Sequence, residues 1–515
     1  MPGRGVSMSG AGDDRSVVAG SIRRLAVRAS AWTTVSYAYG EGTRLVSSLV
    51  IAFLLARADN IAALGLIAYA NILTRGLQML SDVGLNMSVV QHARGEDEAF
   101  LRTAWSVQAI RGVVMWVLCV GLAWPWAWFF GEPSLVLVVP VVGFSVVLAG
   151  FASPGALLAE RKLRGGLLAA LEMVPQTAAV LVMLVWASIE ATVWALASAT
   201  VVRMLVRMVL SHALAPPSGF RFVFDREALG SILRFGAWIF LSTALTFGTM
   251  ELPALTIGKA FDAETLAIFS LALMYAMLPS QAVVRLARQA LFPALSAVVN
   301  RGGDLGGALA RVQGPLRTFG GFASAALFAS GPWFVLAVYP DKLWDASWML
   351  LGLAWVPLLR ILSECSRSPL LARGNARATA IGQGLKLVSL GVLLPLGIWR
   401  FGLHGAVAAA VASEAVQYVA YAVQAERQGL RTLRGDALAL FGAVLAGVAG
   451  LAASVWVWSV GGPALGLEGR VLAGVALLGG LVVPAAVYAR GAWRSVRAVR
   501  GAGNGSEVER MGGSG

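Results

Sequence analysis

Residues 30–56 read SAWTTVSYAYGEGTRLVSSLVIAFLLA, an apolar run long enough to cross a membrane as one helix. Polar side chains recur in it at steps of three and four residues, so they share one face of the predicted helix. This stripe consists of Thr34, Tyr37, Glu41, Arg44 and Ser48. A charge at mid-membrane depth costs about 2.5–3.5 kcal/mol, so a charged stripe here indicates a functional face.

Similar apolar runs of about 20 residues recur along the rest of the chain, separated by short polar segments. Of the 515 residues, 58% are hydrophobic and 13% are charged, a composition that excludes an ordinary soluble domain. The runs number about fourteen and lie at 30–56, 61–91, 102–130, 134–159, 166–188, 191–213, 231–258, 264–290, 309–338, 346–371, 377–399, 402–425, 436–459 and 470–490. The sequence therefore predicts an all-α integral membrane protein with about 14 transmembrane helices. Cys119 and Cys365 both lie in apolar runs, and we expect no disulfide between them.

Arg and Lys residues are distributed unevenly over the segments between the runs. One alternate set of segments, with both chain ends, holds most of them. The other set holds only Arg57, Lys259, Lys342, Arg400 and Arg470. Because short loops rich in Arg and Lys stay in the cytoplasm, we predict an even number of spans with both termini cytoplasmic. The net charge of +14 arises largely from these loops, so nucleic acid is not an expected partner.

The chain also repeats itself at a spacing of about 206 residues. Ala31-Trp32 is matched by Ala237-Trp238, and Pro125-Trp126 is matched by Pro332-Trp333. Two pseudo-symmetric six-helix lobes of this kind bind their substrate at the lobe interface and open alternately to either side. The predicted divisions are 1–29 (cytosolic tail), 30–213 (N-terminal lobe), 214–230 (cytosolic linker), 231–425 (C-terminal lobe), 436–490 (two appended helices) and 491–515 (disordered cytosolic tail).

Charged residues inside the predicted spans are more often basic than acidic. The basic set is Arg44, Arg75, Arg111, Arg203, Arg207, Arg285, Arg288, Arg360, Arg367 and Lys386. The acidic set is Glu41, Asp82, Glu172, Glu251, Glu364 and Glu414. Intramembrane charges face a water-filled cavity or one another. The excess of cations therefore predicts a water-filled cavity that receives a negatively charged substrate.

Polar stripes at helical spacing also occur in three other runs. Their members are Asn71, Arg75, Gln78 and Asp82 in the second run, Ser242, Thr246, Thr249 and Thr256 in the seventh, and Ser270, Met274, Met277, Gln281, Arg285 and Arg288 in the eighth. The first and second runs are equivalent to the seventh and eighth under the repeat. We therefore expect these four helices to line one shared central cavity.

Structural roles remain open for several of these charges. Four arginines lie toward the cytosolic ends of their spans and could extend to the headgroups, namely Arg203, Arg207, Arg285 and Arg288. Arg360 and Glu364 are one helical turn apart and could form a structural ion pair, as could Glu41 and Arg44. Arg75 has no carboxylate within one turn on either side, so a cavity-lining role is favoured for it.

Short segments in both halves of the chain form an ordered series. The first half contains Leu54-Leu55-Ala56-Arg57, Leu64-Gly65-Leu66 and Leu80-Ser81-Asp82-Val83-Gly84-Leu85. The second half contains Arg234-Phe235-Gly236, Ile257-Gly258-Lys259, Phe269-Ser270-Leu271-Ala272 and Leu291-Phe292-Pro293-Ala294-Leu295-Ser296. This series resembles bacterial polysaccharide flippases of the multidrug/oligosaccharidyl-lipid/polysaccharide exporter superfamily. The resemblance covers most of residues 25–430 and is greatest to the branch that serves lipopolysaccharide and exopolysaccharide synthesis in the inner membrane.

The resemblance implies that the substrate is an oligosaccharide carried on undecaprenyl pyrophosphate, which is turned from the cytosolic to the outer leaflet. Arginine suits phosphate because its planar fork of donors matches the oxygens. Substrate contacts are then expected from Arg44, Arg75, Arg285, Arg288, Tyr37, Gln78 and Gln281. A proton or sodium ion is expected to couple transport, with Glu41, Asp82 and Glu251 as its candidate ligands. Membrane lipids, a polysaccharide polymerase and the export machinery are further expected partners, and no catalytic residue, metal or other cofactor is expected.

Other functions of such a chain predict different features. An ion-coupled exporter of cationic drugs should have a net acidic cavity, whereas this one is predicted to be basic. A membrane polymerase or ligase needs a large outward loop with catalytic residues, whereas every predicted outward loop is short. A flippase for the peptidoglycan lipid precursor would show the same residue pattern, and the residues do not separate it from the polysaccharide branch.

Overall fold

The computed structural model describes residues 10–81, 97–162, 164–215, 226–287, 291–430, 432–465 and 469–489. These residues are helical apart from short connections, and no strand occurs among them. The chain divides into two compact units, Met1–Ala244 and Leu245–Gly515. The boundary falls inside one long helix, α9.

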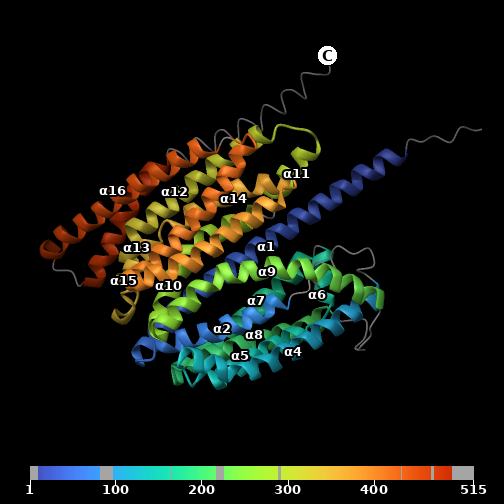
Figure 1. The fold of residues 1–515 in the computed structure, drawn as a ribbon, viewed down its shortest axis with the longest axis horizontal. Helices are drawn as coiled ribbons and strands as arrows, with labels where there is room; N and C mark the ends of the chain where they lie inside the picture. The colour runs from blue at the N-terminus through green and yellow to red at the C-terminus, as the bar shows by residue number, and fades with distance from the viewer. Residues whose placement is uncertain are drawn as a thin grey trace, which may run out of the picture. The chain divides into compact units, whose positions relative to one another are not determined.

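The first unit contains α1 (Gly10–Arg57), α2 (Ala62–Leu80), α4 (Glu98–Phe130), α5 (Leu135–Gly150), α6 (Gly155–Arg161), α7 (Gly165–Ile189), α8 (Val193–Leu214) and the start of α9 (Arg226–Ala260). Here α4 packs on α5, α5 also contacts α2 and α8, and α7 packs against both α1 and α8 (Figure 1). Because α1 begins at Gly10, the predicted cytosolic tail 1–29 is helical from that residue onward.

The second unit contains the remainder of α9, α10 (Ala263–Leu286), α11 (Phe292–Asn300), α12 (Leu305–Val338), η2 (Asp341–Leu343), α13 (Ala346–Leu353), α14 (Val356–Ala372), α15 (Ala376–Arg427), α16 (Leu433–Leu465) and a last helix, Gly469–Ala489. In this unit α12 contacts α13, α14 and α16, and α14 packs on α15. Small residues allow the close contacts with the appended helices, as at Gly450, whose neighbours are Ala329 and Gly480.

Local chemistry explains two breaks in the helices. The fourth apolar run is divided into α5 and α6, because Pro154 lacks an N–H and disfavours helix before it. The freed groups are satisfied by the end of α8: the Ser153 N–H donates to Ser211 Oγ, and Ser153 Oγ donates to the Ala215 carbonyl. In α15 the break is at Gly402, whose φ of 58° and ψ of −138° are tolerated by glycine.

Ten helices among the described residues are long and apolar enough to cross a membrane, and α5 is a shorter apolar helix. The chain is thus a multi-pass membrane protein. The break at Gly402 lies at the junction of the predicted runs 377–399 and 402–425, so the 52 residues of α15 form two helices rather than one. The predicted run 346–371 is divided between α13 and α14. The total of 14 spans and the cytoplasmic position of both termini stay predictions.

The structure corrects one predicted ion pair. Arg360 does not pair with Glu364: the Glu364 carboxylate accepts from Arg367 at 2.7–3.0 Å and from Ser368, whereas Arg360 Nη1 lies 3.7 Å from Glu414 Oε1. Spacing along α14 permits either pairing, and the approach of α15 decides between them. Cys119 and Cys365 are both buried and free.

Candidate functional site

Four helices in the first unit contribute most of the described lining of an open cavity of about 630 Å³. Its volume lies within the range of about 300–1,000 Å³ found for small-molecule sites. The described residues of α2, α4, α5 and α8 that give it polar character are Asn71, Thr74, Arg75, Gln78, Gln108, Arg111, Ser145, Thr200, Arg207 and Ser211. On α2 these residues recur at three- and four-residue steps and form one continuous polar face, whereas on α8 Met204 lies between Thr200 and Arg207 on the cavity-lining face.

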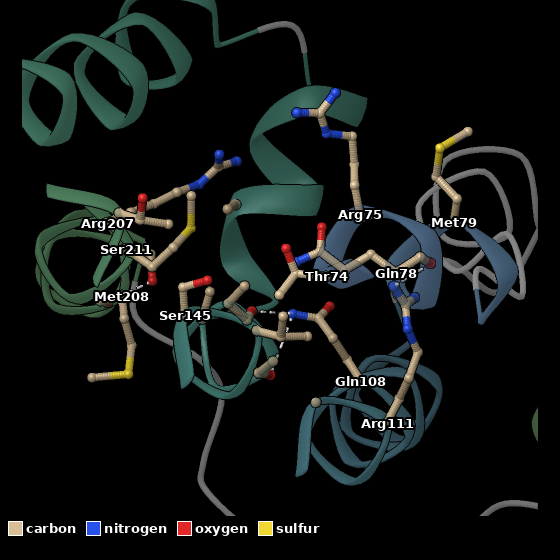
Figure 2. Close-up of a pocket in the computed structure, with 18 of the residues that line it drawn as sticks. Thr74, Arg75, Gln78, Met79, Gln108, Arg111, Ser145, Arg207, Met208 and Ser211 are labelled. Atoms are coloured by element: carbon tan, nitrogen blue, oxygen red, sulfur yellow. Dashed lines mark hydrogen bonds between the residues drawn. The ribbon is translucent and has the colours of Figure 1, made fainter. Parts of the chain in front are cut away.

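Close packing of α4 on α5 positions one wall of the cavity. A Cβ on Gly112 would lie 2.9 Å from the Val146 carbonyl oxygen and 3.3 Å from the Gly150 Cα, so the two helices meet through their glycines. This approach lets Gln108 Nε2 donate to the Ala149 carbonyl at 2.9 Å (Figure 2). The Gln108 amide thus satisfies the carbonyls at the end of α5 and remains on the cavity wall.

Three arginines line the cavity, each on a different helix (Figure 2). Arg111 of α4 is held toward α2, because its Nε donates to Ser81 Oγ at 3.0 Å and its Nη2 donates to the Gln78 carbonyl at 3.3 Å. Arg75 of α2 and Arg207 of α8 are exposed. Arg207 forms no ion pair with a described residue.

The cavity wall is cationic, because no Asp or Glu is among the described residues that line it. Three guanidinium groups on one cavity wall attract an anion, and the Coulomb interaction strengthens where the dielectric is below that of water. Amides and hydroxyls between the arginines, such as Gln78, Thr74 and Ser145, can exchange hydrogen bonds with hydroxyl groups. The arrangement suits a ligand that combines phosphate or carboxylate charge with a polar, hydroxyl-rich part.

The structure places the predicted site residues of the first unit in two groups. Arg75 and Gln78 line the cavity, as the stripe on the second run predicted. Glu41 and Arg44 form an ion pair at 2.6 Å on α1, and neither is among the cavity-lining residues. Tyr37 lies one turn before Glu41 and is half-buried. Asp82 is outside the described residues.

The predicted site residues of the second unit lie on two neighbouring helices of the chain. Gln281 and Arg285 are half-buried on α10, at the spacing of one turn. Glu251 is buried on α9, with 5% of its surface exposed. Arg288 lies outside the described residues.

Sequence reasoning counted Arg111 and Arg207 among the intramembrane cations, but it named none of Gln108, Arg111 and Arg207 as a substrate contact. The sequence did contain a sign of the cavity role of Arg111, because this charge lies in the middle of an apolar run and an amide, Gln108, lies one turn before it. For Arg207 extension to the headgroups competed with a cavity role. The faces that line a cavity depend on which helices are neighbours, and spacing within one helix does not contain that information.

The chain is similar to known proteins over more than half of its length. A family model described as "Polysaccharide biosynthesis protein" matches residues 54–348. The succinoglycan biosynthesis transport protein ExoT of Rhizobium meliloti (strain 1021) is 22% identical over 262 residues, which are 51% of this chain and 52% of that protein. The chain therefore spans about half the length of the curated relative that it matches.

Solved structures share the fold at low sequence identity. The lipid II flippase MurJ in an inward closed conformation matches with a TM-score of 0.64 and 13% identity, over 91% of this chain and 99% of that one. An inward-facing multidrug resistance MATE family transporter of the MOP superfamily matches with a TM-score of 0.58 and 15% identity, over 76% of this chain and 94% of that one. A MOP superfamily transporter from Pyrococcus furiosus Vc1 matches with a TM-score of 0.55 and 15% identity, over 78% of this chain and 95% of that one. These likenesses establish the fold.

Proposed function

Because the chain belongs to the polysaccharide biosynthesis protein family, we propose that it is a flippase. Its substrate is an oligosaccharide linked to undecaprenyl pyrophosphate, which it moves from the cytosolic to the outer leaflet for exopolysaccharide or lipopolysaccharide synthesis. The cavity with three arginines and no carboxylate among its described lining residues is the observation that carries this proposal. The ExoT match, whose name gives succinoglycan biosynthesis transport, supports the polysaccharide branch.

The chemistry of the cavity fits both parts of such a substrate. Guanidinium groups bind phosphate oxygens through paired donors, and Arg75 and Arg207 extend from facing helices (Figure 2). Side-chain amides and hydroxyls replace the water lost by the sugar. The polyprenyl tail stays in the hydrocarbon core, because its transfer to water is unfavourable. Lobes that open alternately to the two sides would then move the headgroup across.

Two other substrates of the same superfamily fold are alternatives. A cationic drug would meet three arginines in the first unit, which disfavours a multidrug exporter. The peptidoglycan lipid precursor is also an anionic polyprenyl glycolipid, so the cavity charge does not separate it from the polysaccharide substrate. The identity of the glycolipid that accumulates without the protein distinguishes these possibilities.

The test is deletion of the gene followed by mass spectrometry of the lipid-linked glycans on the cytosolic side. We expect one undecaprenyl-pyrophosphate oligosaccharide to accumulate and its polysaccharide to disappear from the surface. Complementation with Arg75→Ala should restore membrane insertion but not export, whereas Arg57→Ala, an exposed residue at the end of α1, should restore both. Arg44→Ala tests whether the paired arginine also acts on substrate. Accumulation of the peptidoglycan precursor, or full rescue by Arg75→Ala, would contradict the proposal.

A further inference from the structure

A buried charge cluster lies inside the second unit, between α14 and the two halves of α15. Lys386 Nζ donates to Glu414 Oε1 at 2.5 Å, and Arg360 Nη1 lies 3.7 Å from the same oxygen. Lys386 and Glu414 are 8% and 4% exposed. Glu414 Oε2 is buried and accepts no hydrogen bond from a described residue. Two cations therefore share one carboxylate oxygen, while the second oxygen is buried without a hydrogen bond from a described residue.

This cluster has one more positive charge than negative charge. The Arg360 side chain is 25% exposed, whereas Lys386 is buried, so Lys386 is the cation that is costlier to keep charged. Arg360 stays protonated because a guanidinium is not deprotonated in proteins, whereas a buried lysine amine releases its proton readily. The neighbouring Glu364 is balanced by Arg367 and supplies no further compensation. Glu414 is held ionised by the cations beside it, so Lys386 is the group of the cluster that can exchange a proton.

A row of polar contacts between the two halves of α15 adjoins this cluster. Gln417 Nε2 donates to Gln383 Oε1 at 2.7 Å, and Tyr421 Oη donates to the Thr379 carbonyl at 3.3 Å. These contacts follow the Lys386 pair at steps of three and four residues on each half, so they are stacked one turn apart. We call the two contacts the polar ladder.

The polar ladder joins mid-membrane depth to one end of the helix pair. Lys386 lies ten residues after Ala376, which is about 15 Å along the helix and half of the roughly 30 Å hydrocarbon core. Glu414 lies 13 residues before Arg427, at a similar depth. The end formed by Ala376 and Arg427 is the one that the distribution of Arg and Lys predicts to be cytoplasmic.

Other charged and titratable groups lie on the helices that carry or contact the cluster. They are Glu364 and Arg367 on α14, Glu251 on α9, and Tyr418 and Tyr421 on α15. α9 reaches α15 where a Cβ on Gly248 would lie 2.7 Å from the side chain of Leu387, the residue after Lys386. Arg360 also contacts Met277 Sδ on α10 at 3.5 Å.

We propose that Lys386 and Glu414 form a proton-binding site that fills and empties during transport, with the polar ladder as its access path. The proton moves between Lys386 Nζ and water that enters along the ladder, and Arg360 keeps Glu414 ionised in both states. This inference rests on the proposed function, since a coupling site requires a transported substrate. It assigns the coupling ion to residues other than the sequence-predicted candidates Glu41, Asp82 and Glu251.

The first test observes the amine directly. The chain has four lysines, Lys162, Lys259, Lys342 and Lys386, so full-length protein labelled with ¹³Cε-lysine gives four resolvable NMR signals. Lys386→Arg identifies the Lys386 signal, and Lys386→Met does so if that variant does not accumulate. We expect this signal to shift with pH across the physiological range while the other three stay fixed. A Lys386 signal that also stays fixed would overturn the proposal.

The second test asks whether the site couples transport. Export is measured in the deletion strain before and after an ionophore collapses the pH gradient. We expect the ionophore to reduce export several-fold for the wild-type chain. It should not reduce export further for Lys386→Arg, because the arginine cannot release its proton. Gln417→Leu, which breaks the ladder, should export more slowly while retaining its response to the gradient. Lys342→Arg makes the same change at an exposed lysine and should behave as wild type.

The outcomes separate the two proposals. If Lys386→Arg responds to the ionophore as the wild-type chain does, the proton site is refuted and the flippase stands. If the deletion strain accumulates no lipid-linked glycan, the flippase is refuted, and the NMR titration still decides whether Lys386 exchanges a proton. Export that depends on sodium and ignores the pH gradient would also overturn the proton site.

Discussion

Replacing Arg207 by glutamine removes one of the three charges of the cavity while retaining a polar side chain of similar length. Arg111 is already engaged by Ser81 and the Gln78 carbonyl, so Arg207 has more of its donors available for substrate. A hydrogen bond to a charged group contributes about 1.5–3 kcal/mol. At about 1.4 kcal/mol per factor of ten, Arg207→Gln should weaken binding of undecaprenyl pyrophosphate by about 10- to 100-fold.

The same helix supplies a matched control for this prediction. Arg203 lies one turn before Arg207 on α8. It is exposed, as Arg207 is, but it is not among the cavity-lining residues. Arg203→Gln therefore makes the same chemical change outside the cavity and should alter affinity by less than about twofold. Binding is measured on purified protein by native mass spectrometry, and export is measured in the deletion strain. Equal losses for both variants, or an unchanged affinity for Arg207→Gln, would refute the assignment of the cavity.

Three further predictions concern stability, each measured by thermal unfolding in detergent. In Gly405→Ala the new methyl group would overlap the Gly397 backbone on the facing half of α15, and this should cost at least about 3 kcal/mol. Gly391→Ala on the same element meets no neighbour within 4 Å and should be tolerated. Similar melting temperatures for the two variants would contradict this prediction. Asp436→Ala leaves the half-buried Arg317 without its carboxylate partner and should cost about 3 kcal/mol. Asp341→Ala breaks an exposed pair and should cost less than about 1 kcal/mol, and equal costs would argue against the Arg317–Asp436 network. The hydroxyl and backbone N–H of Thr265 donate hydrogen bonds to Asp262 and hold the pKa of that carboxyl below its ordinary value. The stabilisation that Asp262 gives the folded state is therefore present at pH values above the ordinary pKa and is lost as pH falls through the lowered pKa. Asp262→Ala should therefore cost about 1 kcal/mol at neutral pH and less in acid, and a cost that grows in acid would show that the cap is not the cause.

Much of the fold follows from hydrophobicity and spacing within single helices. The membrane-spanning character, the Gly402 junction and the polar face of α2 could all be predicted, because each depends on residues close in sequence. The division of the fourth run at Ser153-Pro154 was missed, although the proline was visible. The hydroxyl and carbonyl at the end of α8 that satisfy the freed groups lie about 60 residues away in the sequence, so length and hydropathy alone favoured one span.

The sequence by itself determined that this chain lies in a membrane, that its spans carry more cations than anions, and that Arg75 shares a face with Gln78. It did so because hydropathy and helical periodicity are local properties. Only the tertiary structure decided that Arg75 shares a cavity with Arg207, and that Lys386 and Arg360 share Glu414. Such partnerships depend on which helices are neighbours and on how they are rotated, and side-chain pairs far apart in sequence leave no periodic signal in one chain.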